Sequence, residues 1–243
     1  MTDPSQGRTE PGLEFREVTV RYEPAAPSVL AGVSFSVAVG ERVGLIGLNG
    51  SGKTTALMAV VGLVPHEGRI LVTGTPLSRR SAPEIRNRVG FLFNVPENQL
   101  LFPKVIEDVA FGLVRRGLPS REASERAMRI LESLGISELA ESAVHHLSHG
   151  QKQRVALAGA MVTDPAVLLL DEPSAGLDPP GRRRLARLLR DLPAAMLVAT
   201  HDLDFASQTC SRFLVLERGR LVRDIRDAAD LHRCWEHELP YRQ

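Results

Sequence analysis

Apolar residues recur along the N-terminal part of the chain in the two periods that distinguish strands from helices. Regular alternation of apolar and polar side chains predicts half-buried strands near a sheet edge around Val18–Tyr22 and Val33–Val37. Short apolar runs elsewhere are typical of more fully buried strands. The predicted strands lie at 18–22, 33–37, 42–47, 68–74 and 89–93, and a helix is predicted at 54–64.

The pattern changes in the middle of the chain and then changes back. Helical periods punctuated by Gly and Pro predict three helices between about 95 and 165. Two fully apolar runs follow, and each leads directly into acidic or His residues, as buried parallel strands do at a ligand-binding edge. The helices are predicted at 105–117, 121–135 and 150–162, the two strands at 166–173 and 194–202, and a closing hairpin at 212–224. The pattern therefore predicts an α/β core interrupted by a helical insert.

Composition narrows the classes of protein that fit this pattern. The chain has 243 residues, 43% of them hydrophobic and 24% charged, with a formal net charge of +1, so no global field favours nucleic acid or an anionic membrane. Only two cysteines are present, Cys210 and Cys234, which indicates a reducing compartment. The polar N-terminus has no apolar signal core, and no apolar run approaches the length of a membrane span. We therefore expect a partner to hold the protein at any membrane it serves.

The stretch GLNGSGKTT follows a predicted strand and opens a predicted helix, which is the context of a phosphate-binding loop. Glycines let backbone N–H groups turn toward phosphate oxygens, and the helix N-terminus adds its positive end. Lys53 would bring a positive charge to the β- and γ-phosphates, and the Thr54 hydroxyl would bind Mg²⁺. A Gly-rich turn without a ligand is the alternative. The candidate loop residues are Gly47, Asn49, Gly50, Ser51, Gly52, Lys53, Thr54 and Thr55.

Two adjacent carboxylates end the apolar run AVLLLDEP. Asp171 and Glu172 would repel each other unless a cation shares the site, so Asp171 suits Mg²⁺ and Glu172 suits the water that attacks the γ-phosphate. The alternative is an acidic pair that caps the next segment. His201 ends the next strand, in VATHD, where an imidazole could donate a hydrogen bond to the γ-phosphate or be a satisfied core residue.

Five motifs occur in a fixed order: the phosphate loop, LSHGQ, LLLDEP, SAGLDP and THD. Over about residues 13 to 225 this set resembles the nucleotide-binding ATPase subunit of ABC transporters. The resemblance implies a P-loop NTPase core with an antiparallel β subdomain and an inserted α-helical subdomain. The implied boundaries are a disordered lead-in at 1–12, the core at 13–94 and 166–226, the helical signature subdomain at 95–165, and a C-terminal helix or tail at 227–243.

The same resemblance implies how the motifs are used with ATP and Mg²⁺. Two such domains pair head to tail, so Ser148, Gly150 and Gln151 of LSHGQ would serve a nucleotide held by a second ATPase subunit, in a homodimer or a heterodimer. Asp178 would communicate across the dimer, and His201 would be the switch histidine. Tyr22 stands where the family stacks an aromatic ring on adenine, with a core tyrosine at a strand end as the alternative.

The segment NVPENQLLFPKVIEDVAFG, residues 94–112, is similar to ATPases of energy-coupling-factor and cobalt/nickel importers. This similarity implies a transmembrane coupling protein and a substrate-binding integral membrane protein as partners, no nucleic acid, and a peripheral location on the cytoplasmic face of the cell membrane. Two positions depart from the family pattern. Asn94 replaces the usual Gln near Mg²⁺, so it would reach the metal only through a water, and His149 replaces the commonest Gly of the signature.

Other interpretations stay open at this point. The ATPase of an exporter, of a vitamin importer or of an amino-acid importer would carry similar motifs. A soluble ABC ATPase acting on ribosomes or DNA is a more distant alternative, because the chain has neither tandem domains nor long coiled coils. A nucleotide-gated binding module without turnover is a third.

Two His-rich clusters and one basic helix have both a functional and an ordinary interpretation. Each cluster could bind nickel or cobalt, but the favoured interpretation is a solvated loop or tail. A nucleic-acid patch is one reading of the helix at 181–192, but its leucines form a stripe that favours a core-facing side and a charged outer face. The first cluster is His145, His146 and His149, and the second is His232, Cys234 and His237. The leucine stripe is Leu185, Leu188, Leu189 and Leu192. Trp235 is expected to anchor the last helix.

Overall fold

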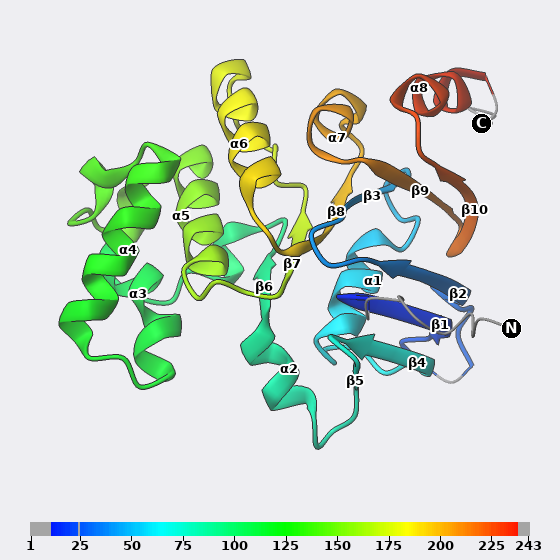
Figure 1. The fold of residues 1–243 in the computed structure, drawn as a ribbon, viewed down its shortest axis with the longest axis horizontal. Helices are drawn as coiled ribbons and strands as arrows, with labels where there is room; N and C mark the ends of the chain where they lie inside the picture. The colour runs from blue at the N-terminus through cyan, green and yellow to red at the C-terminus, as the bar shows by residue number, and fades with distance from the viewer. Residues whose placement is uncertain (1–10, 24, 238–243) are drawn as a thin grey trace, which may run out of the picture.

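The computed structural model describes residues 11–23 and 25–237, without the side chains of residues 236 and 237. Two sheets organise this part of the chain (Figure 1). The smaller is antiparallel and has the strand order β2-β1-β4-β5. Its strands are β1 (Leu13–Val20), β2 (Leu30–Val37), β4 (Glu67–Val72) and β5 (Thr75–Pro76).

The larger sheet has the order β10-β9-β3-β8-β7-β6 and is parallel except for the β9–β10 hairpin. Parallel pairing requires long crossovers, and helices supply them. The strands are β3 (Arg42–Ile46), β6 (Val89–Leu92), β7 (Val167–Asp171), β8 (Ala195–Thr200), β9 (Arg212–Glu217) and β10 (Arg220–Ile225). The predicted hairpin is confirmed.

The helices fall into groups along the chain. Figure 1 shows α3, α4 and α5 gathered at one end of the molecule, away from the antiparallel sheet. The α-helices are α1 (Lys53–Val60), α2 (Ala82–Arg88), α3 (Val105–Arg115), α4 (Ser120–Leu134), α5 (His149–Met161), α6 (Pro179–Asp191), α7 (Leu203–Thr209) and α8 (Ala228–His237). Short 3-10 turns are η1 (Pro96–Asn98), η2 (Ser137–Leu139) and η3 (Val144–His146).

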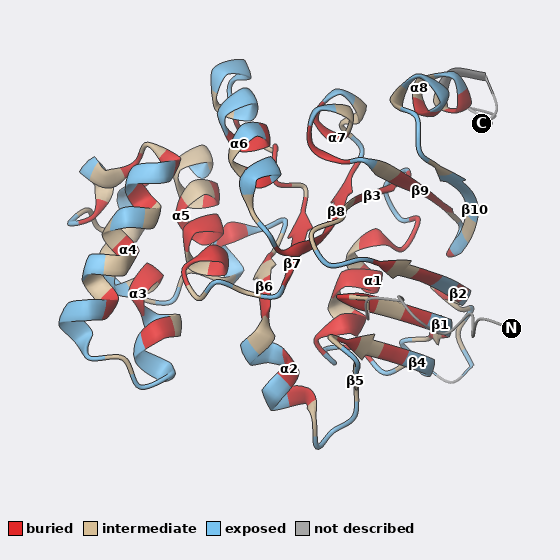
Figure 2. Cartoon of the chain, in the orientation of Figure 1, coloured by how far each residue is buried: buried red, intermediate tan, exposed pale blue. Residues whose placement is uncertain are grey.

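The parallel strands divide their side chains between two cores, which explains why they lack polar alternation. In β7, Leu168 and Leu170 pack with the helices α3 to α7, whereas Val167 and Leu169 pack with α1 and the antiparallel sheet. Figure 2 shows β7 and β8 buried, with the exposed residues on the outer helices and sheet rims. Fully burying one such leucine contributes about 1.5–3 kcal/mol. The predicted α/β class, with its antiparallel sheet and helical region, is confirmed.

Three details of the sequence-based prediction are wrong. Strand β1 ends at Val20, before Tyr22, and it is the second strand of its sheet, between the edge strand β2 and β4. The α1 helix stops at Val60 instead of continuing to residue 64, ahead of Gly62. The short helices α2 and α7 were not predicted, since seven residues give too little periodicity to see.

The basic helix α6 has the predicted division of faces. Leu185 and Leu189 are buried, and Leu188 and Leu192 are partly buried against the same core. Trp235 of α8 is also partly buried against this core, as expected. Both cysteines, Cys210 and Cys234, are buried, and burial raises the pKa of the Cys210 thiol to about 12, which leaves it unreactive.

Candidate active site

The phosphate loop joins the end of β3 to the start of α1 in a tight turn that has no room for a side chain at two of its glycines. A Cβ atom on Gly47 would lie 2.4 Å from the carbonyl oxygen of Leu216, and Gly52 has φ +106°. Both positions therefore require glycine. The turn directs the first amides of α1 toward the loop, where a helix N-terminus attracts anions. This is the strand–loop–helix context that the sequence predicted.

Lys53 is the first residue of α1 and is buried. Its ammonium donates hydrogen bonds to the carbonyl oxygens of Gly47 (2.8 Å) and Leu48 (3.2 Å). Burial lowers the pKa of Lys53, while the charges of Glu172 and Asp171 act in the opposite direction. The lysine thus lies inside the loop, with its charge held next to the space where phosphate oxygens would sit.

Thr54 and Asp171 meet across the site although they are far apart in sequence. The Thr54 hydroxyl donates a 2.7 Å hydrogen bond to Oδ2 of Asp171. Burial raises the pKa of the Asp171 carboxyl, and this hydrogen bond opposes the shift. A hydroxyl and a buried carboxylate side by side form a hard oxygen donor set, which fits Mg²⁺.

Glu172 follows β7 and is held by two partners through its side chain. Thr200 donates a 2.9 Å hydrogen bond to Oε2, and Nδ1 of His201 lies 2.8 Å from Oε1. The Glu172 side chain is 16% exposed and that of His201 is 61% exposed. The carboxylate therefore has a fixed orientation, whereas the imidazole borders solvent.

A cavity of about 380 Å³ lies against the phosphate loop and both carboxylates. Asn94 lines it together with the acidic residues, so the structure places this predicted metal-site residue beside Asp171 and Glu172. Ser148, Gly150 and Gln151 do not line it. The cavity is lined by Val29, Asn49, Gly50, Gly52, Lys53, Thr54, Thr55, Asn94, Asp171 and Glu172.

The signature residues form a helix start instead of part of this cavity. Ser148 is the N-cap of α5: its hydroxyl accepts from the backbone N–H of Gln151, and the Gln151 side chain accepts from the backbone N–H of Ser148. This capping box leaves the exposed turn preorganised. Asp178 caps α6 in a similar way, accepting from the backbone N–H of Gly181 at 3.0 Å.

Tyr22 lies beyond the end of β1 and is 57% exposed, so the alternative of a core tyrosine is wrong. Its hydroxyl is 3.1 Å from Oγ1 of Thr55. The aromatic ring thus stands beside the phosphate loop, free to contact a planar ligand.

Two residues that hold Glu172 were missed at the level of sequence. Thr200 is fully buried at the end of β8, and Gln153 of α5 donates to the Glu172 carbonyl at 3.3 Å. In VATHD, Thr200 is a polar residue at the end of an apolar run, and this position could have indicated that it belongs to the site. Gln153 gave no such signal, because its partner is distant in the sequence.

The His145, His146 and His149 cluster does not share a helical face, as its metal reading required. His145 and His146 belong to η3, whereas His149 begins α5 and its Nδ1 lies 3.9 Å from Oε1 of Glu97. In the second cluster, the side chain of His237 lies outside the described residues. Among the residues described, no group of three or more His, Cys, Asp or Glu side chains could hold a metal ion.

A glycine-rich loop at a helix start, a buried lysine and two carboxylates at the end of β7 define a nucleoside-triphosphate site of the P-loop class. The family model described as ABC transporter matches residues 30–175. A Gloeobacter violaceus protein, provisionally named an ABC transporter ATP-binding protein, is 48% identical over 215 residues, which cover 87% of this chain and 88% of that protein. The chain therefore belongs to the ABC transporter family and is an ATP-binding subunit that hydrolyses ATP.

More specific relatives include an energy-coupling factor transporter ATP-binding protein of Methanocaldococcus jannaschii. It is 38% identical over 218 residues, covering 87% of this chain and 78% of that protein. Among solved structures, cbiO1 from Clostridium perfringens, part of the ABC transporter complex cbiONQ, has a TM-score of 0.81 and 34% identity, covering 94% and 93% of the two chains. A dimeric cassette with bound ADP and phosphate has a TM-score of 0.80 and 26% identity, covering 88% and 98%.

Proposed function

We propose that this ATPase subunit drives a membrane importer of the energy-coupling-factor type that carries cobalt or nickel ions. The segment 94–112 supports the importer group, and so do the resemblances to the Methanocaldococcus and Clostridium proteins. The cargo never has to contact an ATPase subunit, so the metal-ion assignment depends on these resemblances.

The observation that carries the proposal is a groove with exposed apolar side chains beside the helical region. The groove has a volume of about 420 Å³, and Leu101 at its rim is 71% exposed. Phe111 of α3 is 39% exposed, and its ring lies 4.9 Å from that of Phe102. Exposed apolar residues around a concavity are typical of a docking surface for a partner helix.

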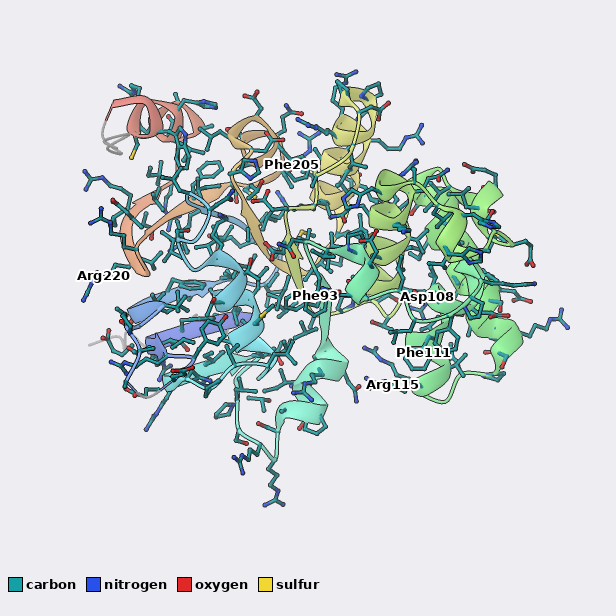
Figure 3. The ribbon with its side chains drawn as sticks, turned by 180° about the vertical axis from the view of Figure 1, so that it is seen from behind. Phe93, Asp108, Phe111, Arg115, Phe205 and Arg220 are labelled. Atoms are coloured by element: carbon teal, nitrogen blue, oxygen red, sulfur yellow. The ribbon has the colours of Figure 1, made fainter. Side chains whose placement is uncertain are left out.

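Asp108 holds the loop that carries Leu101 and Phe102, which with Phe111 form the proposed docking surface. Its carboxylate accepts from the backbone N–H groups of Leu101 (2.6 Å) and Phe102 (2.8 Å). Figure 3 shows Asp108, Phe111 and Arg115 together along α3. We infer that the transmembrane coupling protein seats a short helix here, and that the substrate-binding membrane protein joins through it.

Within the ATP site each residue has a chemical role that its position supports. The loop amides and Lys53 bind the β- and γ-phosphates, and Tyr22 contacts the adenine ring. Thr54 and Asp171 would hold Mg²⁺, with Asn94 reaching it through a water; when bound, the ion offsets the negative charge of the phosphate oxygens. Glu172 accepts the proton of the attacking water, and His201 donates a hydrogen bond to the γ-phosphate.

The signature turn would complete the site of a second subunit. The turn lies outside the cavity of its own chain, and Ser148 is exposed there at a capped helix start, which suits an anion from elsewhere. We infer a head-to-tail dimer in which Ser148, Gly150 and Gln151 of one chain contact the γ-phosphate in the other. Asp178, at the start of α6, would lie at the same interface.

The proposed location is the cytoplasmic face of the cell membrane, held there by the membrane partners. No helix in the described part of the chain is both long and apolar enough to cross a bilayer. Attachment through the docking surface would therefore be peripheral.

Affinity capture of the full chain from native membranes tests the proposal, with mass spectrometry of the bound proteins. We expect integral membrane proteins, among them a small one that binds cobalt or nickel. Leu101→Glu should release them, while Val39→Glu, which alters another exposed apolar residue, should retain them. Recovery of ribosomal or DNA-associated proteins alone would overturn the transport role and leave the ATPase activity intact.

A further inference from the structure

Gln153 is a buried amide that none of the assigned roles uses. It lies in α5, two residues beyond the signature, and is 1% exposed. Its Nε2 donates to the carbonyl oxygen of Glu172 at 3.3 Å, and its Oε1 has no hydrogen-bond partner in the described structure. A buried oxygen without a partner destabilises the fold, so the amide has a cost that a functional role would offset.

The backbone that Gln153 contacts is in an unusual conformation. Glu172 has φ +50°, a region that residues other than glycine seldom occupy. Such a conformation persists only where the surroundings hold it, and it is common at functional sites. The Glu172 N–H donates to the Ala199 carbonyl at 2.8 Å, and the Glu172 carbonyl accepts from Ala175 at 3.0 Å as well as from Gln153.

The signature turn packs directly on the loop that follows Glu172. A Cβ atom on Gly150 would lie 2.7 Å from the carbonyl oxygen of Gly176, so these two backbones touch. A Cβ on Gly176 would in turn lie 2.9 Å from the His149 ring. Gln153 adds a hydrogen bond to the Glu172 carbonyl itself, so a shift of α5 would reach the Glu172 backbone.

We propose that Gln153 is a positioning residue that links the signature helix to Glu172 of the same chain. A nucleotide bound at Ser148 in the dimer would then fix the orientation of Glu172 in the chain that carries that signature. In this way each ATP would prepare the neighbouring site for hydrolysis. The inference rests on the proposed function, because it needs Glu172 as the base and a head-to-tail dimer.

Gln153→Met tests the link with little change of shape. It removes the bond to Glu172 together with the unpartnered oxygen, so we expect the unfolding temperature to be unchanged or higher. Displacing a catalytic group slightly should lower kcat roughly ten- to hundredfold. KM and the affinity for a fluorescent ATP analogue should stay within about twofold, since no nucleotide contact is lost.

Thr209→Val is the matched control. Thr209 of α7 is also buried and also has an unpartnered oxygen, but it lies outside the ATP site. We expect it to keep the wild-type kcat with an equal or higher unfolding temperature. Gln153→Asn keeps an amide that is one methylene too short to reach Glu172, and it should reproduce the loss of kcat if Gln153→Met does not fold.

A double-mutant comparison separates this inference from the proposed function. If Gln153 acts through Glu172, the double variant Gln153→Met/Glu172→Gln should hydrolyse ATP at the same residual rate as Glu172→Gln alone. A kcat close to wild type in folded Gln153→Met would overturn the link. So would a double variant whose kcat falls below that of Glu172→Gln by the same factor that Gln153→Met causes in the wild-type protein. Full turnover by Glu172→Gln alone would instead refute the base assigned to the proposed function.

Discussion

Single residues in this protein act through fixed hydrogen bonds between segments that are distant in the sequence. Thr200 is the clearest example: its hydroxyl donates to Oε2 of Glu172 and accepts from the backbone N–H of Asp202 at 3.0 Å. A hydrogen bond to a carboxylate is charge-assisted and therefore stronger than a neutral one. Since Thr200 is buried, water cannot replace it.

We expect Thr200→Val to lower kcat roughly tenfold, because the loss of a hydrogen bond to a charged group costs about 1.5–3 kcal/mol. Thr200→Ser keeps the hydroxyl and should stay within about threefold of wild type. Steady-state ATPase rates, with thermal unfolding to confirm folded protein, make the comparison. Equal rates for the two variants would show that the hydroxyl does not orient Glu172.

At the scale of secondary-structure elements, Arg212 joins three strands. From β9 it donates to both carboxylate oxygens of Asp224 in β10, at 2.7 and 2.6 Å, and to the carbonyl oxygen of Ser36 in β2, at 2.9 Å. The closing hairpin is thereby attached to the edge of the antiparallel sheet. The Arg212 hydrogen bonds lower the pKa of the Asp224 carboxyl.

Asp224→Asn should reduce the free energy of unfolding by about 0.5–1 kcal/mol at pH 7. This is the upper part of the range for exposed ion pairs, and it applies because the pair is bidentate and only half-exposed. Because the folded-state pKa is lowered, this contribution is complete above the unfolded pKa and disappears as pH falls through the folded value. Urea unfolding at pH 7 and at progressively lower pH measures it. Glu67→Gln, which removes a more exposed single contact with Arg21, should be nearly neutral. A wild-type advantage that persisted in strong acid would contradict the assignment.

At the scale of the whole molecule, the ATP cavity and the signature turn are separate places on one chain. In the proposed head-to-tail dimer, a complete site would therefore need a second copy or a similar subunit. Helix α5 contributes in two directions: its capped start faces outward, while its Gln153 side chain reaches inward to Glu172. One helix thus serves two sites in the proposed dimer.

Mixing two inactive variants tests this arrangement. Lys53→Met disables the phosphate loop and Ser148→Arg disables the signature turn, so each should be inactive alone. A mixed dimer would contain one site with an intact loop and an intact signature. We expect part of the ATPase activity to return on mixing, at a reduced rate, because Glu172 of that site belongs to the chain whose signature turn is disabled. If mixed dimers form, as seen by differently tagged chains, and stay inactive, the head-to-tail arrangement is wrong.

The sequence determined the local chemistry, because it depends on neighbours along the chain. The spacing of Gly47, Gly52 and Lys53 specifies a phosphate loop, and the apolar runs before Asp171 and His201 specify buried strands with polar ends. The order of the motifs also sufficed to predict the family and the two-part α/β architecture.

Only the tertiary structure decided which distant groups meet. Periodicity describes one face of one segment, so it could not place β1 inside its sheet, reveal the short helices α2 and α7, or separate His145 from His149. Nor could it join Thr54 to Asp171, or Thr200 and Gln153 to Glu172. The contacts of Thr54 and Thr200 arise because parallel strands bring their carboxyl ends to one edge of the sheet. The contact of Gln153 with Glu172 arises because α5 packs against that edge.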